Sequence, residues 1–254
     1  MNTLLYANIS FGHENDWDVI RQRVVAAAQC NADAVVISKA TPTKVIPEEK
    51  RYVAINSKWG TMPYIEVAKK SEIDVGNTAK LIELTEQIGI PLIWSVTDAD
   101  AAAWVREHTN CTTIKVHVDY THDWETVLYC VENFENIIYG NNSENITHLL
   151  THYLNKNRDR KRLTLYHAGG AMPTHVESAE LSIIDTLKMH NVEVGYEGRI
   201  EGIYPDCAVV FKHVKFIEKY LGDDDETNEL VLTPAKFYDF FINMNQLEIA
   251  NGQA

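Results

Sequence analysis

Residues 4–38 read LLYANISFGHENDWDVIRQRVVAAAQCNADAVVIS and contain one complete strand–helix–strand unit. Apolar residues fill Leu4–Ser10 and Ala34–Ser38 almost continuously, which is typical of parallel strands buried on both faces. Between these runs, residues 17–28 carry apolar side chains at helical spacing and predict an amphipathic helix. The stretch therefore predicts two parallel strands joined by a helix.

The same alternation continues along the rest of the chain. The runs expected to form strands are Leu4–Ser10, Ala34–Ser38, Pro91–Val96, Thr112–His117, Asn136–Asn141, Arg162–His167, Val192–Tyr196 and Val214–Tyr220. The segments between them carry apolar residues at helical spacing, as Leu81, Leu84 and Ile88 do. Eight such repeats in 254 residues match the size of a closed (β/α)₈ (TIM) barrel, which is the fold class we predict.

An open doubly wound sheet is the main rival, and its first strand commonly leads into a glycine-rich turn. The corresponding turn here, Phe11–Asp16, contains a single glycine and lacks the dinucleotide fingerprint. We therefore expect one barrel domain over residues 1–254. One segment, Thr41–Asp74, interrupts the alternation of strand and helix patterns and carries three prolines and a Lys/Glu cluster. We predict that it forms a large loop after the second strand.

The formal net charge of -13 disfavours nucleic-acid and anionic-membrane partners, because both require a basic face. A small anionic substrate stays compatible with it, since a few converging Lys or Arg residues reverse the local field. The four cysteines lie far apart without zinc-type spacing, which favours buried thiols in a reducing compartment. No stretch is typical of a signal peptide or a transmembrane helix, so we expect a cytoplasmic protein.

Polar residues recur where the predicted strands end. In a barrel of this kind the reactive groups lie at the carboxyl ends of the strands and in the loops that follow. These residues form a ring that is more basic than the chain as a whole and suits an anionic or sugar substrate. The residues expected to contact substrate are Lys39, Ser95, Lys115, His117, Asn141 and Lys219.

Two carboxylates, Glu197 and Glu218, lie near the ends of the last two predicted strands and could act as acid and base. The competing interpretation is structural, with these carboxylates paired to Arg199 and Lys219. We assign Glu197 and Arg199 as the candidate catalytic residues.

A histidine, His167, ends the sixth predicted strand and is followed by Gly169 and Gly170. This places a metal-capable imidazole beside backbone that a ligand can approach closely. His167 is therefore the candidate metal ligand, and a hydrogen-bonded structural histidine is the alternative.

Several stretches resemble, in order and spacing, the motifs of the N-acetylneuraminate (sialic acid) synthase family. They are HEND at 13–16, NADAVV at 31–36, WSVTD at 94–98, LYH at 165–167 and FIEKYL at 216–221. The resemblance runs over almost the whole chain and implies a TIM barrel.

The resemblance also implies an activity, the condensation of phosphoenolpyruvate with an N-acyl amino sugar. A divalent metal, Mn²⁺ or Mg²⁺, is implied to polarise the sugar aldehyde. His167 matches one metal ligand of the family, and Lys115 matches a phosphate-contacting lysine. The second metal-binding histidine falls at Arg199, and family residues on the first two strands are replaced by Asn8 and Val36.

The single matching histidine leaves three outcomes open for the metal. The metal is lost, or His167 recruits His117 or Glu197 as a further ligand, or Arg199 supplies the positive charge instead. The sequence therefore predicts a divalent-metal cofactor whose second ligand is in question.

The family's C-terminal antifreeze-like domain has no counterpart in the sequence, so the chain resembles a divergent, barrel-only member. We expect a transferase of the phosphoenolpyruvate-dependent N-acylneuraminate synthase type with altered chemistry. A non-catalytic homologue that binds a sugar, a nucleotide sugar or a protein partner is the alternative, and an unrelated metal-dependent barrel hydrolase or isomerase is a third. A homodimer or a separate partner protein would take the place of the missing domain.

Overall fold

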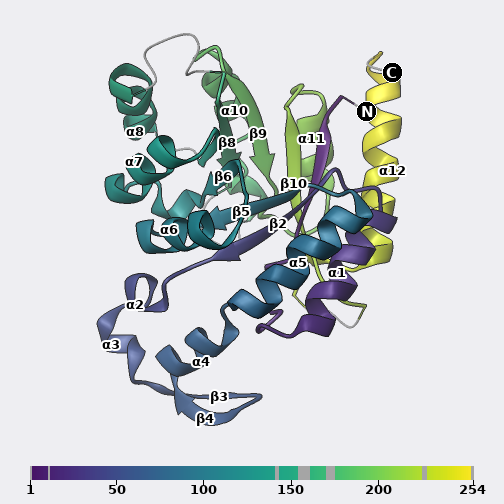
Figure 1. The fold of residues 1–254 in the computed structure, drawn as a ribbon. Coiled ribbons are helices and arrows are strands. Elements are labelled where there is room, and N and C mark those ends of the chain that lie inside the picture. The colour runs from purple at the N-terminus through teal and green to yellow at the C-terminus, as the bar shows by residue number, and fades with distance from the viewer. Residues whose placement is uncertain are drawn as a thin grey trace.

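The computed structural model describes residues 2–10, 12–140, 143–153, 161–169, 175–224 and 228–252. Its parallel strands close on themselves, because β1 pairs with β2 on one side and with β10 on the other. The barrel strands are β1 (Leu4–Asn8), β2 (Ala34–Lys39), β5 (Leu92–Val96), β6 (Thr113–Val116), β7 (Asn136–Gly140), β8 (Leu163–Ala168), β9 (Glu193–Glu197) and β10 (Phe216–Leu221). This closed barrel confirms the predicted (β/α)₈ fold class (Figure 1).

Helices surround the barrel, and polar side chains cap several of their N-termini. Asp16 accepts hydrogen bonds from the backbone N–H groups that open α1, and Asp98 caps α6 in the same way. The helices outside the arm described below are α1 (Trp17–Gln29), α5 (Val75–Ile88), α6 (Ala99–His108), α7 (Trp124–Asn133), α8 (Ser143–His148), α10 (Ser182–Lys188), α11 (Tyr204–Val210) and α12 (Pro234–Ala250). None of the described helices combines the length and the hydropathy needed to cross a bilayer.

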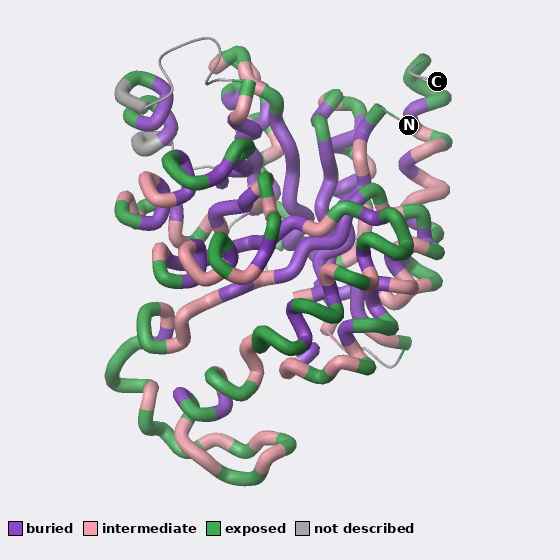
Figure 2. Tube along the Cα trace, viewed as in Figure 1, coloured by how far each residue is buried: buried purple, intermediate pink, exposed green. Residues whose placement is uncertain are grey.

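The prediction of a plain loop over Thr41–Asp74 is wrong, because this segment forms an arm with its own secondary structure. The arm contains α2 (Pro42–Val45), α3 (Glu48–Arg51), the antiparallel hairpin β3 (Ala54–Ser57) and β4 (Gly60–Pro63), and α4 (Tyr64–Ser71). Its prolines stand next to or at the start of helices, where the missing N–H costs no hydrogen bond. The arm projects from the barrel and is mostly exposed (Figure 2).

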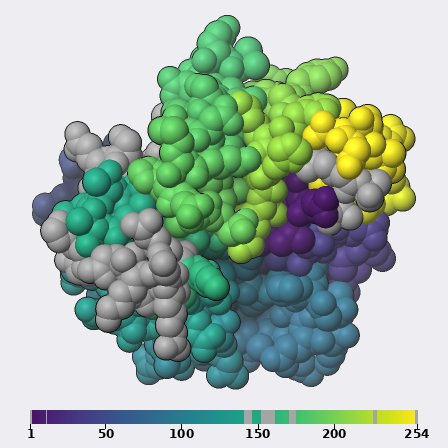
Figure 3. Space-filling model, turned by 90° about the horizontal axis from the view of Figure 1, so that it is seen from above, coloured from purple at the N-terminus to yellow at the C-terminus, as the bar shows by residue number. Residues whose placement is uncertain are grey.

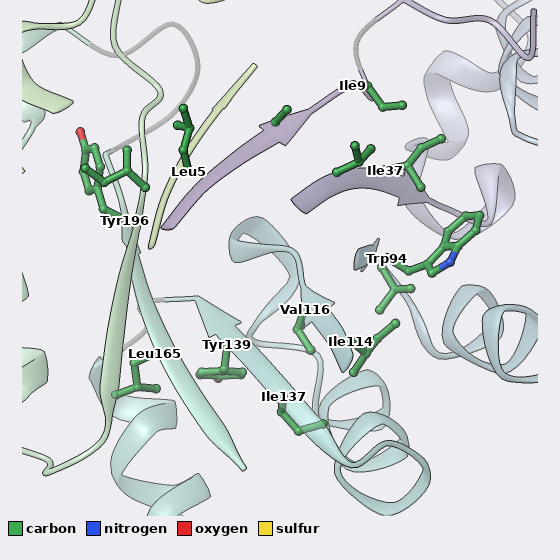
Figure 4. Packing of buried hydrophobic residues seen from close by; sticks show 14 of the residues in the cluster. Leu5, Ile9, Ile37, Trp94, Ile114, Val116, Ile137, Tyr139, Leu165 and Tyr196 are labelled. Atoms are coloured by element: carbon green, nitrogen blue, oxygen red, sulfur yellow. The ribbon is translucent and has the colours of Figure 1, made fainter. Parts of the chain in front are cut away.

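Alternate strand residues point to opposite sides of the barrel wall, which produces two buried layers. Outward-facing residues such as Leu5, Ile37 and Trp94 pack under the helices, and Figure 4 shows members of this cluster from β1, β2 and β5 through β9. Inward-facing residues form a smaller cluster inside the barrel. They are Tyr6, Ala34, Val36, Ile93, Ile138, Tyr166 and Phe216.

The two ends of the described chain lie side by side. The backbone N–H groups of Asn2 and Thr3 donate to the carboxylate of Glu248 on α12, at 2.9 and 2.7 Å. Figures 1 and 3 show α12, in yellow, beside the N-terminal strand in dark purple. This contact fixes the last helix against the start of β1. A short strand, β11 (Val231–Leu232), pairs with β10 immediately before α12.

Candidate functional site

A cluster of charged side chains fills the carboxyl end of the barrel interior. Lys115 on β6, Glu197 on β9 and Glu218 on β10 all point inward, since their strand neighbours belong to the outward-facing core. Arg199 follows β9 by two residues and therefore extends the same inward face. Together these four residues are called the carboxyl-end cluster below.

The ammonium group of Lys115 lies between the two carboxylates. Its Nζ donates to Oε2 of Glu197 at 2.7 Å and to Oε1 of Glu218 at 2.6 Å. The ring of Tyr166 lies beneath it, with Nζ 4.6 Å from the ring centroid. Lys115 and both glutamates are about 1 % exposed. A buried ammonium needs such partners, because an unpaired charge is costly to remove from water.

Arg199 occupies the other side of Glu197. Its Nε donates to Oε1 of Glu197 at 2.7 Å, and Nη1 donates to both oxygens of Asp119, at 3.2 and 3.3 Å. Its Nη2 lies 3.4 Å from Nε2 of His117. Every nitrogen of this fully buried guanidinium thus has a neighbour within the chain.

The environments of the two glutamates shift their pKa values in opposite directions. Burial alone would raise the pKa of Glu197, but Lys115 and Arg199 outweigh it and hold that pKa well below its usual range. For Glu218, burial dominates over Lys115, and repulsion from Glu197 adds to it, so its pKa is raised. A pair of this kind is the arrangement that separates an ionised carboxylate from a neutral carboxylic acid.

His117 follows β6 and is a neutral base in this setting. Burial, reinforced by the charges of Arg199 and Lys115, lowers the pKa of His117 to about 4, although Glu197 acts against that shift. Its Nδ1 accepts a weak hydrogen bond from the backbone N–H of Asp119 at 3.4 Å. His117 therefore adds no positive charge to the cluster near neutral pH.

Two polar atoms next to Lys115 have no hydrogen-bond partner among the described residues. They are Oε2 of Glu218 and the hydroxyl of Ser95, which lies on β5 directly opposite Lys115 in the β5–β6 pairing. Both atoms are buried, where an unpaired polar group costs free energy. Each would therefore gain a hydrogen bond from a ligand hydroxyl or oxyanion that reached it.

The structure brings some of the predicted site residues together and places others elsewhere. Ser95, Lys115, His117, Glu197 and Arg199 converge at the carboxyl end of the barrel. The remaining candidates lie outside this cluster or outside the described residues; they are Lys39, Lys219, Asn141 and His167.

Lys39 and Lys219 both point away from the barrel interior. Lys39 donates to the carbonyl of Ile73 at 2.9 Å and pairs with Glu72 at 3.2 Å. Its Nζ also lies 4.4 Å from the ring centroid of Trp104 on α6. Side chains alternate along β2, so Lys39 points outward like Val35 and Ile37. Its ammonium group binds Glu72 and the carbonyl of Ile73, and so connects the barrel to the end of the arm. Asn141 lies outside the described residues.

Lys219 supports the loop that carries Arg199. Its Nζ donates to Oδ2 of Asp206 on α11 at 2.9 Å and to the carbonyl of Ile200 at 2.8 Å. Gly198 fits this packing, since a Cβ there would lie only 1.8 Å from Oδ1 of Asp206. Lys219 is therefore a positioning residue for Arg199 in this fold.

His167 stands apart from the carboxyl-end cluster. It points outward from β8, and its Nε2 donates to the carbonyl of Ala179 at 2.8 Å, which leaves Nδ1 without a partner. Burial lowers its pKa. This geometry is that of a neutral, hydrogen-bonded histidine beside Tyr196.

The carboxyl-end cluster does not fit the divalent metal that the resemblance implies. The described residues contain no group of three or more His, Cys, Asp or Glu side chains placed to hold a metal. Both oxygens of Glu197 already accept hydrogen bonds from cations, and Arg199 lies where a positive ion would be repelled. The carboxyl-end cluster is therefore not assigned a metal-binding role.

Three further polar residues support the carboxyl-end cluster, and the sequence analysis did not assign them a role in the site. Tyr220 donates to Oε1 of Glu197 at 2.9 Å, Asn8 donates to Oε1 of Glu218 at 2.8 Å, and Asp119 pairs with Arg199. Strand alternation could have identified Tyr220, because it lies two residues after Glu218 on the same face. Asp119 carries no such signal, since it lies in a short 3₁₀ turn.

Comparison with known proteins gives one family match. The model of the NeuB family matches residues 23–254, which is most of the chain. A search of curated proteins finds no match.

Solved structures share the fold at low sequence identity. The N-acetylneuraminic acid (sialic acid) synthetase of Leptospira borgpetersenii, in complex with citrate, has a TM-score of 0.85 and 16% identity over 99% of this chain and 86% of its own. The spore coat polysaccharide biosynthesis protein E of Chromobacterium violaceum has a TM-score of 0.82 and 16% identity over 98% and 76%. The spore coat polysaccharide biosynthesis protein spsE of Bacillus subtilis has a TM-score of 0.78 and 15% identity over 99% of this chain and 70% of its own. At these identities the likeness concerns the fold.

Proposed function

The chain belongs to the NeuB family, and from that premise we propose that it is a sialic-acid-synthase-like transferase that condenses phosphoenolpyruvate with an N-acyl amino sugar. The observation that carries the proposal is the position of Lys115 between Glu197 and Glu218 at the carboxyl end of the barrel. That end is where enzymes of this fold hold their reactive groups.

Glu218 is the proposed acid and base. In the condensation, C3 of phosphoenolpyruvate forms a bond to the aldehyde carbon of the sugar, and the aldehyde oxygen takes the proton of neutral Glu218. Water then adds to C2 and returns a proton to the Glu218 carboxylate, and inorganic phosphate leaves. The raised pKa of Glu218 favours its neutral, proton-donating form, which supports this role. Its Oε2 is buried without a hydrogen-bond partner among the described residues, so a substrate oxygen that reached it would supply the missing one.

The proposed electrostatic stabilisation of the substrate comes from two cations, Lys115 and Arg199, and from the carboxylate of Glu197 that positions them. Ionised Glu197 holds the two cations in place through hydrogen bonds of 2.7 Å each. Those cations offset the negative charge of phosphoenolpyruvate and of the developing alkoxide. The hydroxyl of Ser95 lies beside Lys115 and is free to donate to the same substrate oxygen atoms.

Release of inorganic phosphate tests the proposal directly. The protein is incubated with phosphoenolpyruvate and N-acetylmannosamine, and each substrate is also supplied alone. We expect phosphate release only when both are present, and a rate in Glu218→Gln that is lower by at least about 100-fold, as for loss of a general acid. Glu193→Gln is the matched control, since Glu193 is an exposed glutamate at the opposite end of β9.

The metal is varied in the same assay. The donor set of the cluster predicts that MnCl₂ or EDTA changes the rate by less than about two-fold, in contrast to Lewis-acid catalysis. No phosphate release under any of these conditions would contradict the proposed activity.

A non-catalytic binding protein is the second candidate. It is favoured by the saturation of Lys115 and Arg199, whose nitrogens are all engaged within the chain. A ligand would have to displace one of these partners. Stabilisation of the protein by phosphoenolpyruvate or N-acetylmannosamine, in thermal unfolding without phosphate release, would identify this function.

The proposed location is the cytoplasm. Cys30, Cys111, Cys130 and Cys207 are all free thiols. Burial raises the pKa of each, which keeps the thiols protonated and unreactive. Free thiols of this kind are typical of a reducing compartment.

A further inference from the structure

A cavity of about 610 Å³ opens at the amino end of the barrel, opposite the carboxyl-end cluster. Residues at or near the starts of the strands line it, among them Leu4 on β1, Ala34 on β2, Thr113 on β6 and Thr164 on β8. The volume lies within the range of small-molecule pockets. Nothing in the proposed reaction uses this end of the barrel.

The inner wall of the cavity is apolar and aromatic. Tyr6 and Phe216 stack with their ring centroids 4.5 Å apart and their planes within 12° of each other. Ile93 and Ile138 continue the wall, and both are buried. Phe216 is fully buried behind Tyr6, so Tyr6 is the ring of this stack that a ligand would meet, next to Ile93 and Ile138. This surface fits a flat, apolar group, because an aromatic ring packs favourably against another ring and aliphatic side chains.

The rim of the cavity carries more positive than negative charge. Lys161, Arg162 and Lys215 line it, against one carboxylate, Asp33. The guanidinium of Arg162 is held by backbone carbonyls, including that of Glu135 at 2.6 Å, so its charge is fixed in place. The Nζ of Lys215 lies 3.4 Å from the hydroxyl of Thr164.

The carboxylate of Asp33 keeps its negative charge but is held at the strand start, where it accepts a hydrogen bond from the backbone N–H of Leu5 at 2.8 Å. The three basic side chains outnumber it, so the net charge at the rim is positive. A negatively charged group on a ligand would receive charge-assisted hydrogen bonds there.

Tyr6 adds a polar group to the inner wall. Burial, with the negative charges of Glu218 and Asp33, raises the pKa of Tyr6 to about 12. Its hydroxyl thus stays a neutral donor at physiological pH.

We propose that this cavity binds a small aromatic carboxylate. The ring lies against Tyr6, Ile93 and Ile138, and the carboxylate faces Lys215 and Lys161 at the rim. The site is independent of the proposed condensation, since its lining residues do not include those of the carboxyl-end cluster.

The probe for this site is indole-3-carboxylate, titrated by isothermal calorimetry and by ligand-observed NMR. Tryptamine is the matched comparison, because it keeps the indole ring and replaces the acid with an amine. We expect the acid to bind and tryptamine to bind at least about five-fold more weakly, as the rim charge requires. Failure of the acid to bind at millimolar concentration, or equal binding of tryptamine, would overturn the proposal.

Two variants locate the binding. Thr113→Trp fills the cavity from its rim and is expected to abolish binding, while circular dichroism and thermal unfolding check that the barrel is intact. Lys215 is exposed, and Lys215→Ala is expected to weaken binding of the acid by about five-fold and to narrow its advantage over tryptamine, because the rim loses a positive charge that repels the amine. Lys212→Ala is the control, since Lys212 pairs with Asp185 and does not line the cavity. Unchanged binding of the acid in either cavity variant contradicts the assignment.

Discussion

The two ends of the barrel interior differ in how their space is filled. The carboxyl end is filled by buried charges that hold one another, with Lys115 between Glu197 and Glu218. The amino end is hollow, with an apolar inner wall and a cavity of about 610 Å³. The buried charges of the proposed site and the open volume of the cavity are therefore at opposite ends of the barrel interior.

The two ends differ because different kinds of side chain point into the barrel at the starts and at the ends of the strands. Small side chains such as Ala34 and Thr164 point inward near the strand starts and leave space. Long charged side chains point inward near the strand ends and fill it. Buried charges that depend on one another make the carboxyl end sensitive to single substitutions, whereas a solvated rim tolerates them.

The largest expected effect is that of Lys115→Met. Removal of the ammonium takes the shared cationic donor from Glu197 and Glu218 and leaves the buried charge of Glu197 with Arg199 alone. We expect the free energy of unfolding to fall by about 3–5 kcal/mol, the usual cost of breaking a buried ion pair on one side. Denaturant unfolding measures it, and Lys69→Met on exposed helix α4 is the control, expected within about 0.5 kcal/mol. Similar small losses in both variants would show that the cluster contributes little to stability.

An intermediate effect should separate the two glutamates. Glu197 has a lowered folded-state pKa, so its contribution to stability is present above its unfolded pKa of about 4.3 and is lost as pH falls. Glu197→Gln is therefore expected to destabilise the protein at pH 7, by about 2 kcal/mol, because Lys115 and Arg199 lose their counter-charge.

Glu218 behaves in the opposite sense. Its folded-state pKa is raised, so its contribution is present below the unfolded pKa and is lost as pH rises through the folded pKa. Glutamine cannot lose a proton, and Glu218→Gln should thus become more stable relative to the wild type as pH rises from 5 to 9. Unfolding curves across that pH range compare both variants, and parallel pH profiles for the two would refute the difference between them.

The smallest effect is expected at the amino end. Thr113 lies at the rim of the cavity and is partly exposed. Thr113→Ala should change the free energy of unfolding by less than about 0.5 kcal/mol, because its neighbours remain solvated. A loss comparable with that of Lys115→Met, measured in the same denaturant series, would remove the contrast between the two ends.

Much of the barrel could be predicted from the sequence, because strands buried on both faces leave continuous apolar runs such as those of β1 and β2. The arm could not, since each strand of its hairpin has only four residues and mixes polar with apolar side chains, which leaves no clear periodicity. The cavity at the amino end also gave no signal. Its volume depends on how strands from the whole chain close around small inward residues.

The sequence predicted where the candidate site lies, but it predicted less well which residues belong to the site. Lys115, Glu197 and Arg199 could be found from strand ends. Lys39 and Lys219 lie at strand ends too, but a shift of one residue along a strand reverses the face to which a side chain points. Strand boundaries inferred from composition are not accurate enough to decide which face each side chain occupies.

Infrared difference spectroscopy tests the central claim, that the two buried glutamates hold opposite protonation states across Lys115. Spectra of the wild type minus each variant are recorded at pH 7 in the region of the carboxylic-acid carbonyl stretch. A protonated-carboxyl band that disappears in Glu218→Gln and persists in Glu197→Gln is the predicted result. Absence of that band in the wild type, or its loss in Glu197→Gln alone, would contradict the account.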